Sequence, residues 1–199
     1  MSFMTYGINI ILGTVSESLV TAYGLYYKIQ QFILFAAFGL RDTITPIVSY
    51  NHGTRDRKRI TDGIRYGIGY TLFIMLVGTL ILEIFAKPIC SAFGLSGTTE
   101  SLCITAIRII SSGLVFAGIS IALQGVFQAL DCGLSSFIIS VCRQLLFILP
   151  VARVFTIFIR PDLSNGWLVW LTFPIAEFLT VSVALILMFR TYKSKIQKL

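Results

Sequence analysis

The chain has 199 residues, of which 56% are hydrophobic and 13% are charged, and its mean hydropathy is +0.86. A soluble domain usually contains about 25% charged residues, so this composition excludes an ordinary water-soluble fold. The net charge of +7 is compatible with nucleic-acid binding. Because the Lys and Arg residues adjoin long apolar runs, as in the cytoplasmic loops of membrane proteins, we reject nucleic acid as a partner and expect a lipid bilayer.

The predicted elements begin with an apolar segment over residues 3–13, which is too short to cross a bilayer alone. It is typical either of the end of a span whose beginning is absent or of an interfacial segment. Five later segments have the roughly 20 apolar residues that a crossing needs: 18–40, 64–86, 104–129, 134–158 and 167–189. The sequence therefore predicts one domain, residues 1–199, of an all-α integral membrane protein with five full transmembrane helices and a truncated N-terminal one.

Turn-forming residues separate these segments. Residues 51–53 (NHG) follow the first span, and Pro88 and residues 94–97 (GLSG) follow the second. Residues 131–133 (DCG) predict a tight hairpin, and residues 161–162 (PD) and 165–166 (NG) separate the last two spans.

The distribution of basic residues predicts the orientation of the chain. Two regions hold most of them: Arg41, Arg55, Arg57, Lys58, Arg59 and Arg65 in the first loop, and Arg190, Lys193, Lys195 and Lys198 in the tail. The two loops that alternate with these basic regions contain one basic residue each, Lys87 and Arg160. Basic loops stay in the cytoplasm, so we predict a multi-pass protein of the cell membrane with a cytoplasmic C-terminus. Five spans then place residue 1 outside, and we expect a further span upstream.

Three charged residues lie deep within the predicted spans. Lys28, Arg143 and Glu177 are nine or ten residues from a span end, which is about 15 Å at 1.5 Å per residue. A charge at this depth costs about 2.5–3.5 kcal/mol on insertion scales. We predict that Arg143 and Glu177 are partners or share a polar cavity, either as a water-filled translocation path or as a structural salt bridge. For Lys28 we favour a functional role.

Phenol and amide side chains recur at helical spacing in two spans. Tyr23, Tyr27 and Gln31 share one face of the first span, and Gln124 and Gln128 share one face of the third. Such groups can line a cavity for organic cations or form hydrogen bonds between helices. Because these five side chains form stripes on two helices, we favour the cavity for the set as a whole.

Small residues and prolines predict how the spans pack. Gly63 and Gly67 form a G-x-x-x-G pair that is typical of close helix contacts. Pro150 and Pro174 lie inside the last two spans, and each is expected to bend its helix.

The motifs of soluble enzymes are absent from the sequence. It contains no P-loop, no G-x-G-x-x-G and no nucleophile elbow. Its four cysteines form no C-x-x-C pair, and it has one histidine. A disulfide between Cys90 and Cys103 is conceivable, but we favour free thiols. We therefore predict no enzymatic activity, no metal site and no cofactor.

Four motifs, in order, resemble the multidrug and toxic compound extrusion (MATE) family. Residues 22–24 (AYG) open a span ending at residues 39–40 (GL), which is followed by residues 45–53 (TPIVSYNHG). This stretch resembles the family's eighth helix and the element after it. The other three resemble the tenth, eleventh and twelfth helices: residues 123–129 (LQGVFQA), 143–150 (RQLLFILP) and 170–177 (WLTFPIAE). The resemblance covers residues 5 to 190.

The resemblance implies the C-terminal lobe of a twelve-helix transporter, with its first helix cut to residues 3–13. Such transporters have two six-helix lobes and export drugs and organic cations in exchange for H⁺ or Na⁺. The implied partners are small-molecule organic cations and either the missing N-terminal lobe or a second copy. Many members carry a coupling aspartate in the N-terminal lobe, and some carry an acidic residue in the tenth helix. Here that helix has only Gln124 and Gln128, with Asp131 at its end.

Two alternatives remain open at this point. One is a lipid-linked saccharide flippase of the same superfamily, which would have a more cationic cavity. The other is a truncated fragment that packs with other helices and transports nothing.

Overall fold

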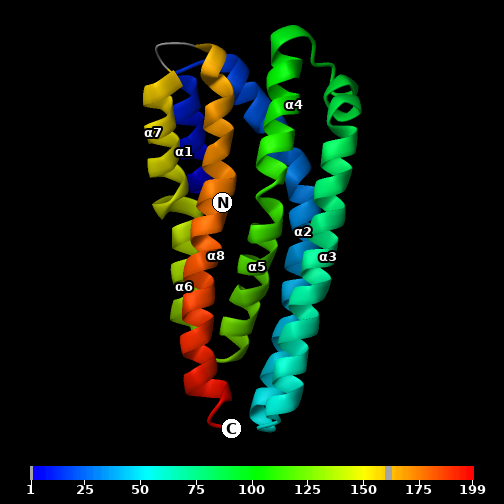
Figure 1. Ribbon diagram of the computed structural model, residues 1–199, viewed down its shortest axis with the longest axis vertical. Helices are drawn as coiled ribbons and strands as arrows, with labels where there is room; N and C mark the ends of the chain where they lie inside the picture. Colours follow the sequence, from blue (N-terminus) through cyan, green and yellow to red (C-terminus); the bar gives the residue numbers. More distant parts are fainter. Residues whose placement is uncertain (1, 160–162) are drawn as a thin grey trace.

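The computed structural model describes residues 2–159 and 163–199, so Arg160 and the predicted turn at residues 161–162 lie outside the described residues. The described part is an upright bundle of antiparallel helices (Figure 1). Its elements are α1 Ser2–Gly13, α2 Glu17–Gly53, α3 Arg57–Ala92, α4 Gly97–Ser111, α5 Leu114–Ala129, α6 Gly133–Val141, the π-helix η1 Cys142–Leu146, α7 Ile148–Ile159, the 3₁₀-helix η2 Leu163–Leu171, α8 Thr172–Thr191 and the π-helix η3 Tyr192–Ile196.

Four stretches are long and apolar enough to cross a membrane: Glu17–Gly53, Arg57–Ala92, Gly133–Ile159 and Asn165–Ile196. The pair α4 and α5, bent by 47° at residues 112–113, makes a fifth. The five stretches contain the five predicted spans. Helix α1 is the short apolar segment, and its N-terminal end lies near half the height of the bundle (Figure 1).

Helices α2 and α3 are much longer than the spans predicted for them. The expected turn at residues 51–53 is still helical, and the loop predicted over residues 41–65 is reduced to residues 54–56. Pro46 and Pro88, of which the second was expected to end a span, both lie inside helices. The reason is a second apolar core, in which the extensions of α2 and α3 pack against the C-terminal half of α5 and against η3: Ile44, Val48, Ile60, Ile64, Ala122, Val126, Ala129, Leu130 and Ile196.

Capping and turn residues set the ends of the connections. The Asp56 side chain caps α3 by accepting a hydrogen bond from the Arg59 backbone N–H at 3.0 Å. Asp131 has φ 55° in the hairpin between α5 and α6, and Gly94 has φ 73° after α3. The G-x-x-x-G pair packs α3 on α2, because a Cβ at Gly67 would lie 2.5 Å from Ile44 Cγ1.

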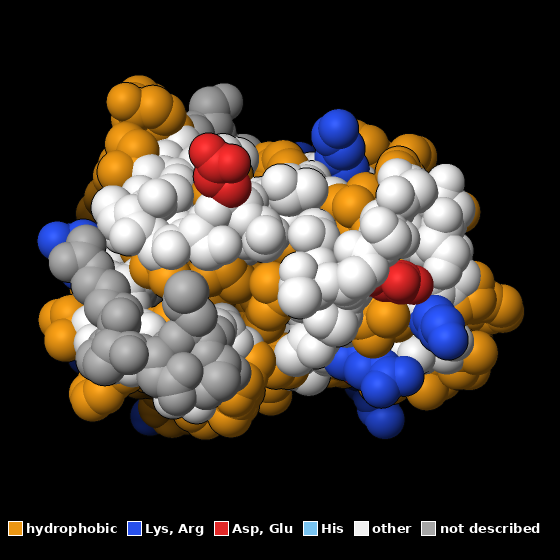
Figure 2. All heavy atoms as spheres, turned by 90° about the horizontal axis from the view of Figure 1, so that it is seen from above, with side chains coloured by type: hydrophobic (Ala, Val, Ile, Leu, Met, Phe, Trp, Pro, Cys, Tyr) orange, Lys and Arg blue, Asp and Glu red, His pale blue; other side chains and the backbone are white. Residues whose placement is uncertain are grey.

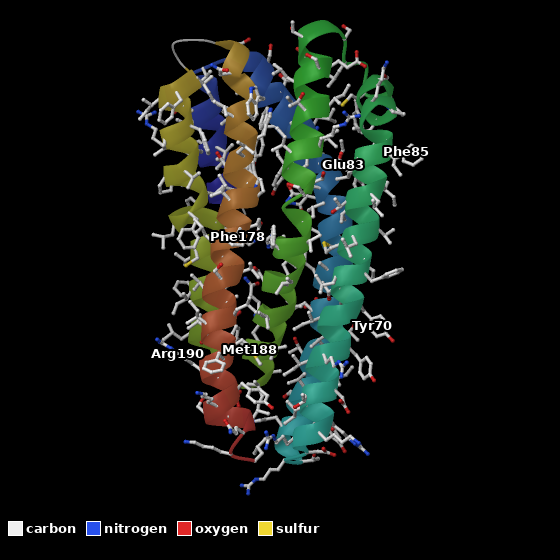
Figure 3. All side chains as sticks on the ribbon, viewed as in Figure 1. Tyr70, Glu83, Phe85, Phe178, Met188 and Arg190 are labelled. Carbon is white, nitrogen blue, oxygen red and sulfur yellow. The ribbon has the colours of Figure 1, made fainter. Side chains whose placement is uncertain are left out.

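Helix α5 is the centre of the bundle. Twelve of its sixteen residues are buried, and it packs against α2, α3, α6 and α8. Large apolar side chains instead cover the outside, where Tyr70 and Phe85 point away from α3 (Figure 3). Such a surface is stable when lipid surrounds it.

The two ends of the bundle differ in charge. The turn at residues 54–56 and the C-terminus lie at the same end (Figure 1), so that end carries most of the basic residues named above. Figure 2 looks onto the opposite end and shows isolated Lys, Arg, Asp and Glu side chains, with hydrophobic side chains around the rim.

Candidate functional site

The candidate site is built around an ion pair inside the bundle. Arg143 Nε donates a hydrogen bond to Glu177 Oε1 at 2.8 Å, and the two side chains are 10% and 15% exposed. Arg143 belongs to η1 and Glu177 to α8, each near the middle of its membrane-length stretch. The pairing predicted from the sequence is therefore present. Whether it serves transport stays a prediction.

The backbone at Arg143 departs from an α-helix. The Phe147 N–H donates to the Cys142 carbonyl at 3.0 Å, which is the i→i+5 bond of a π-helix. Pro150 lacks an N–H and cannot bond the carbonyl of Leu146 four residues earlier. The π-helix ends four residues before Pro150 and carries Arg143, while the bend expected at Pro150 stays a prediction.

A small cavity lined by both polar and apolar side chains adjoins the ion pair, with a volume of about 30 Å³. That is room for about one or two water molecules. Its polar lining comes from α2, η1 and α8: Tyr27, Gln30, Gln31, Arg143, Gln144 and Glu177. Four of the eight residues predicted for a translocation path, namely Tyr27, Gln31, Arg143 and Glu177, thus meet at one cavity.

An aromatic cluster holds α8 against α2 beside this cavity. The Phe173 ring stacks on Tyr23 with centroids 5.5 Å apart, and it lies 6.5 Å from the Tyr26 ring. Phe173 is one turn before Glu177 on α8, so these contacts also fix the position of the carboxylate. Tyr23 is buried beside the cavity, and it is outside the cavity lining.

The two glutamines of α5 lie elsewhere. Gln124 Nε2 donates to Ser140 Oγ at 3.3 Å, and Gln128 Nε2 donates to Ser136 Oγ at 3.2 Å. Both bonds join α5 to α6. For these two residues the geometry favours the second alternative given above, hydrogen bonding between helices.

Lys28 lies on the outer surface of α2 and does not line the cavity. Among the described residues it has no ion pair. It is eleven residues after Glu17, the first residue of α2, or about 16 Å along the helix. An unpaired cation at this depth needs water or another protein chain beside it.

Sequence reasoning missed Tyr26, Gln30 and Gln144. Tyr26 and Gln30 are also spaced i, i+4, one position before the Tyr27–Gln31 pair. This spacing could have indicated Tyr26 and Gln30 as site residues. Spacing alone, however, does not show which of the two neighbouring pairs faces the cavity. Gln144 directly follows Arg143, and the π-helix brings both into the cavity lining.

No metal centre was expected, and no cluster of three or more His, Cys, Asp or Glu that could hold a metal occurs in residues 2–159 and 163–199. Cys90 and Cys103 are buried free thiols in this structure.

These features define the molecule as a bundle of membrane-length helices, with a buried ion pair at a small cavity. The chain belongs to the MatE family, whose model matches residues 1–154. Two curated relatives are similar to it: an FAD transporter of Shewanella oneidensis, 23% identical over 143 residues, and the multidrug export protein MepA of Staphylococcus haemolyticus, 22% identical over 147 residues. The matches cover 72% and 74% of this chain and 32% of each relative.

Solved structures show the same fold. A MATE transporter crystallised in complex with MaL6 matches all of this chain with a TM-score of 0.88 and 21% identity. A multidrug resistance MATE family transporter in an outward-facing conformation matches with a TM-score of 0.88 and 20% identity. Each match covers 44% of the solved chain. The chain thus spans about a third of its curated relatives and corresponds to one lobe of the solved transporters.

Proposed function

We propose that this chain forms one lobe of a secondary active multidrug exporter, which moves organic cations and other xenobiotics out of the cell in exchange for H⁺ or Na⁺. The observation that carries the proposal is the buried Arg143–Glu177 pair beside a small cavity, in a MatE fold. Buried ionisable groups at membrane depth mark ion and substrate pathways. The name of the relative MepA supports an exporter.

A transport path in such a protein lies between two lobes that move against each other. The second wall would come from a separate N-terminal lobe or from a second copy of this chain. The outer face of α2, which carries the unpaired Lys28, is the surface that we assign to this path. The path would cross the cell membrane, with the basic end of the bundle in the cytoplasm.

The experiment is drug accumulation in a pump-deficient bacterium that expresses this chain alone, with membrane insertion checked. We expect a fluorescent organic cation to accumulate less than in the empty-vector control, and Glu177→Gln to restore accumulation. Lys87→Gln, at the end of α3, is the matched control and should still export. Unchanged accumulation despite insertion would contradict export by this chain alone and favour a non-transporting fragment.

A second candidate substrate class is anionic, as in a lipid-linked saccharide flippase. Lys28 favours it, because an unpaired cation on the outer face of α2 would attract a phosphate. The relative named as an FAD transporter supports the same class. Export of a flavin nucleotide but not of the organic cation, with loss in Lys28→Gln, would select this candidate.

A further inference from the structure

Two polar atoms next to the ion pair have no partner in the structure. Glu177 uses Oε1 to bind Arg143, while its Oε2 is buried without a hydrogen bond. The Tyr26 hydroxyl is also buried without one, and Tyr26 is 0% exposed. Buried polar atoms nearly always have a partner, so each exception needs an explanation.

Both atoms belong to residues that line the same second cavity, of about 10 Å³. This is about the smallest space that holds one water molecule. One water can accept a hydrogen bond from the Tyr26 hydroxyl and donate one to Glu177 Oε2. Glu177 also lines the larger cavity, so this residue adjoins both cavities.

Interrupted helices surround this position. The break between α4 and α5 packs on α8 so closely that a Cβ at Gly113 would lie 3.0 Å from Pro174 Cα. Arg143 lies in the π-helix, and η2 gives way to α8 five residues before Glu177. Irregular backbone at membrane depth is tolerated where it is covered by protein or lines a cavity, and transporters use such breaks to build ion sites.

The size of the site and its single free carboxylate oxygen select a proton over a metal cation. A cavity of about 10 Å³ has room for about one water molecule, whereas a hard metal cation takes several oxygen ligands. The titratable groups that line the two cavities with Glu177 are Arg143 on η1 and Tyr26 and Tyr27 on α2. Helices α1, α4, α5 and α7 contribute only uncharged, non-titratable side chains to them.

We propose that Glu177 is the proton-binding site of this lobe, with Tyr26 as its hydrogen-bond partner through one water molecule. A hydronium ion gives its proton to Oε2 and leaves as water. The pair then changes from neutral to a single positive charge, and the amide oxygens of Gln30 and Gln144 can accept hydrogen bonds from the released Arg143. The assignment of the proton as the coupling ion rests on the proposed function, whereas proton binding itself does not.

The test is infrared difference spectroscopy of the purified full chain in lipid nanodiscs, between neutral and acidic pH in deuterated water. We expect the carbonyl band of a protected, protonated carboxyl in the wild type and its loss in Glu177→Gln. Glu83→Gln is the matched control, because Glu83 is another carboxylate within a span and accepts a hydrogen bond from Ser111 at 3.0 Å. The band should survive in that variant.

Tyr26→Phe keeps the inference testable if Glu177→Gln fails to fold, since it removes only the unpaired hydroxyl. We expect the band to remain and its frequency to shift. A band that is absent from the wild type, persists in Glu177→Gln or is unchanged in Tyr26→Phe would overturn the proposed site. This failure can be distinguished from failure of the proposed function. A Glu177 band without drug export would contradict the proposed exporter function, whereas drug export without the band would contradict the proton site.

Discussion

At the scale of single residues, Arg143 and Glu177 depend on each other. Each would be an isolated buried charge without the other, and desolvating such a charge costs several kcal/mol. The cavity beside them provides space for water but no second charged partner among its lining residues. Both side chains are therefore needed to stabilise the ionised state of the site.

We expect Arg143→Gln and Glu177→Gln each to lower the free energy of unfolding by about 3 kcal/mol, since each leaves one buried charge unpaired. The double variant should lose at least about 1 kcal/mol less than the sum of the two. Unfolding in detergent, followed by circular dichroism, measures the three values. Arg108→Gln, at an exposed position of α4, is the control, with an expected change within about 0.5 kcal/mol. Strict additivity would show that the pair is not coupled.

At the scale of elements, close helix contacts at glycine hold α5 in the centre. A Cβ at Gly125 would lie 2.6 Å from Arg41 Cγ and 3.0 Å from the Arg41 carbonyl oxygen. The Thr45 hydroxyl also donates to the Gly125 carbonyl at 3.3 Å. Because a backbone atom of α2 forms part of this contact, the helices must separate to admit a larger residue.

Gly125→Ala is expected to destabilise the lobe by about 1–3 kcal/mol through overpacking. Gly69→Ala is the matched variant, because a Cβ there would meet no atom within 4 Å. It should stabilise by up to about 1 kcal/mol through helix propensity. Thermal unfolding of both variants checks the contrast, and equal behaviour would refute the close α2–α5 contact.

The extent of each element could be predicted only where lipid determined it. The five spans and the hairpin at residues 131–133 follow from apolar length and turn residues. The extensions of α2 and α3 depend instead on packing between Ile44, Ile60 and Val126. The length of an apolar segment does not reveal such contacts between helices. The charged residues in these extensions therefore resembled a loop.

The charged residues of the site could be predicted from the sequence, but not all of its uncharged lining. Arg143 and Glu177 were paired because they lie at similar depth on consecutive helices. The π-helix could not be predicted, because helix faces were assigned with a regular repeat of about 3.6 residues per turn. A π-turn contains an extra residue and rotates the side chains away from those faces. For the same reason Gln144 was missed. Gln124 was assigned to a cavity because its spacing with Gln128 does not tell a cavity from the helix–helix hydrogen bond that it donates to Ser140.

At the scale of the whole molecule, the basic end of the bundle predicts its sidedness. Cysteines placed at Ser194 and Arg55 should react with an impermeant maleimide only after cells are permeabilised, because both belong to the basic end. A cysteine at Thr98, in the first turn of α4 at the opposite end, should react in intact cells. The variants are made after replacement of the four native cysteines. The reverse labelling pattern would invert the proposed orientation.

The π-helix at Cys142–Leu146 also has a consequence for the evolutionary history of the lobe. An i→i+5 bond accommodates one extra residue in a turn, which is how a helix absorbs a single-residue insertion and keeps its later residues in register. Without that residue, the side chains before the bulge would rotate by about 100° relative to those after it. Relatives that lack the insertion should therefore show a one-residue gap opposite residues 142–146, and the cation that faces their last helix should stand at a different alignment column from Arg143.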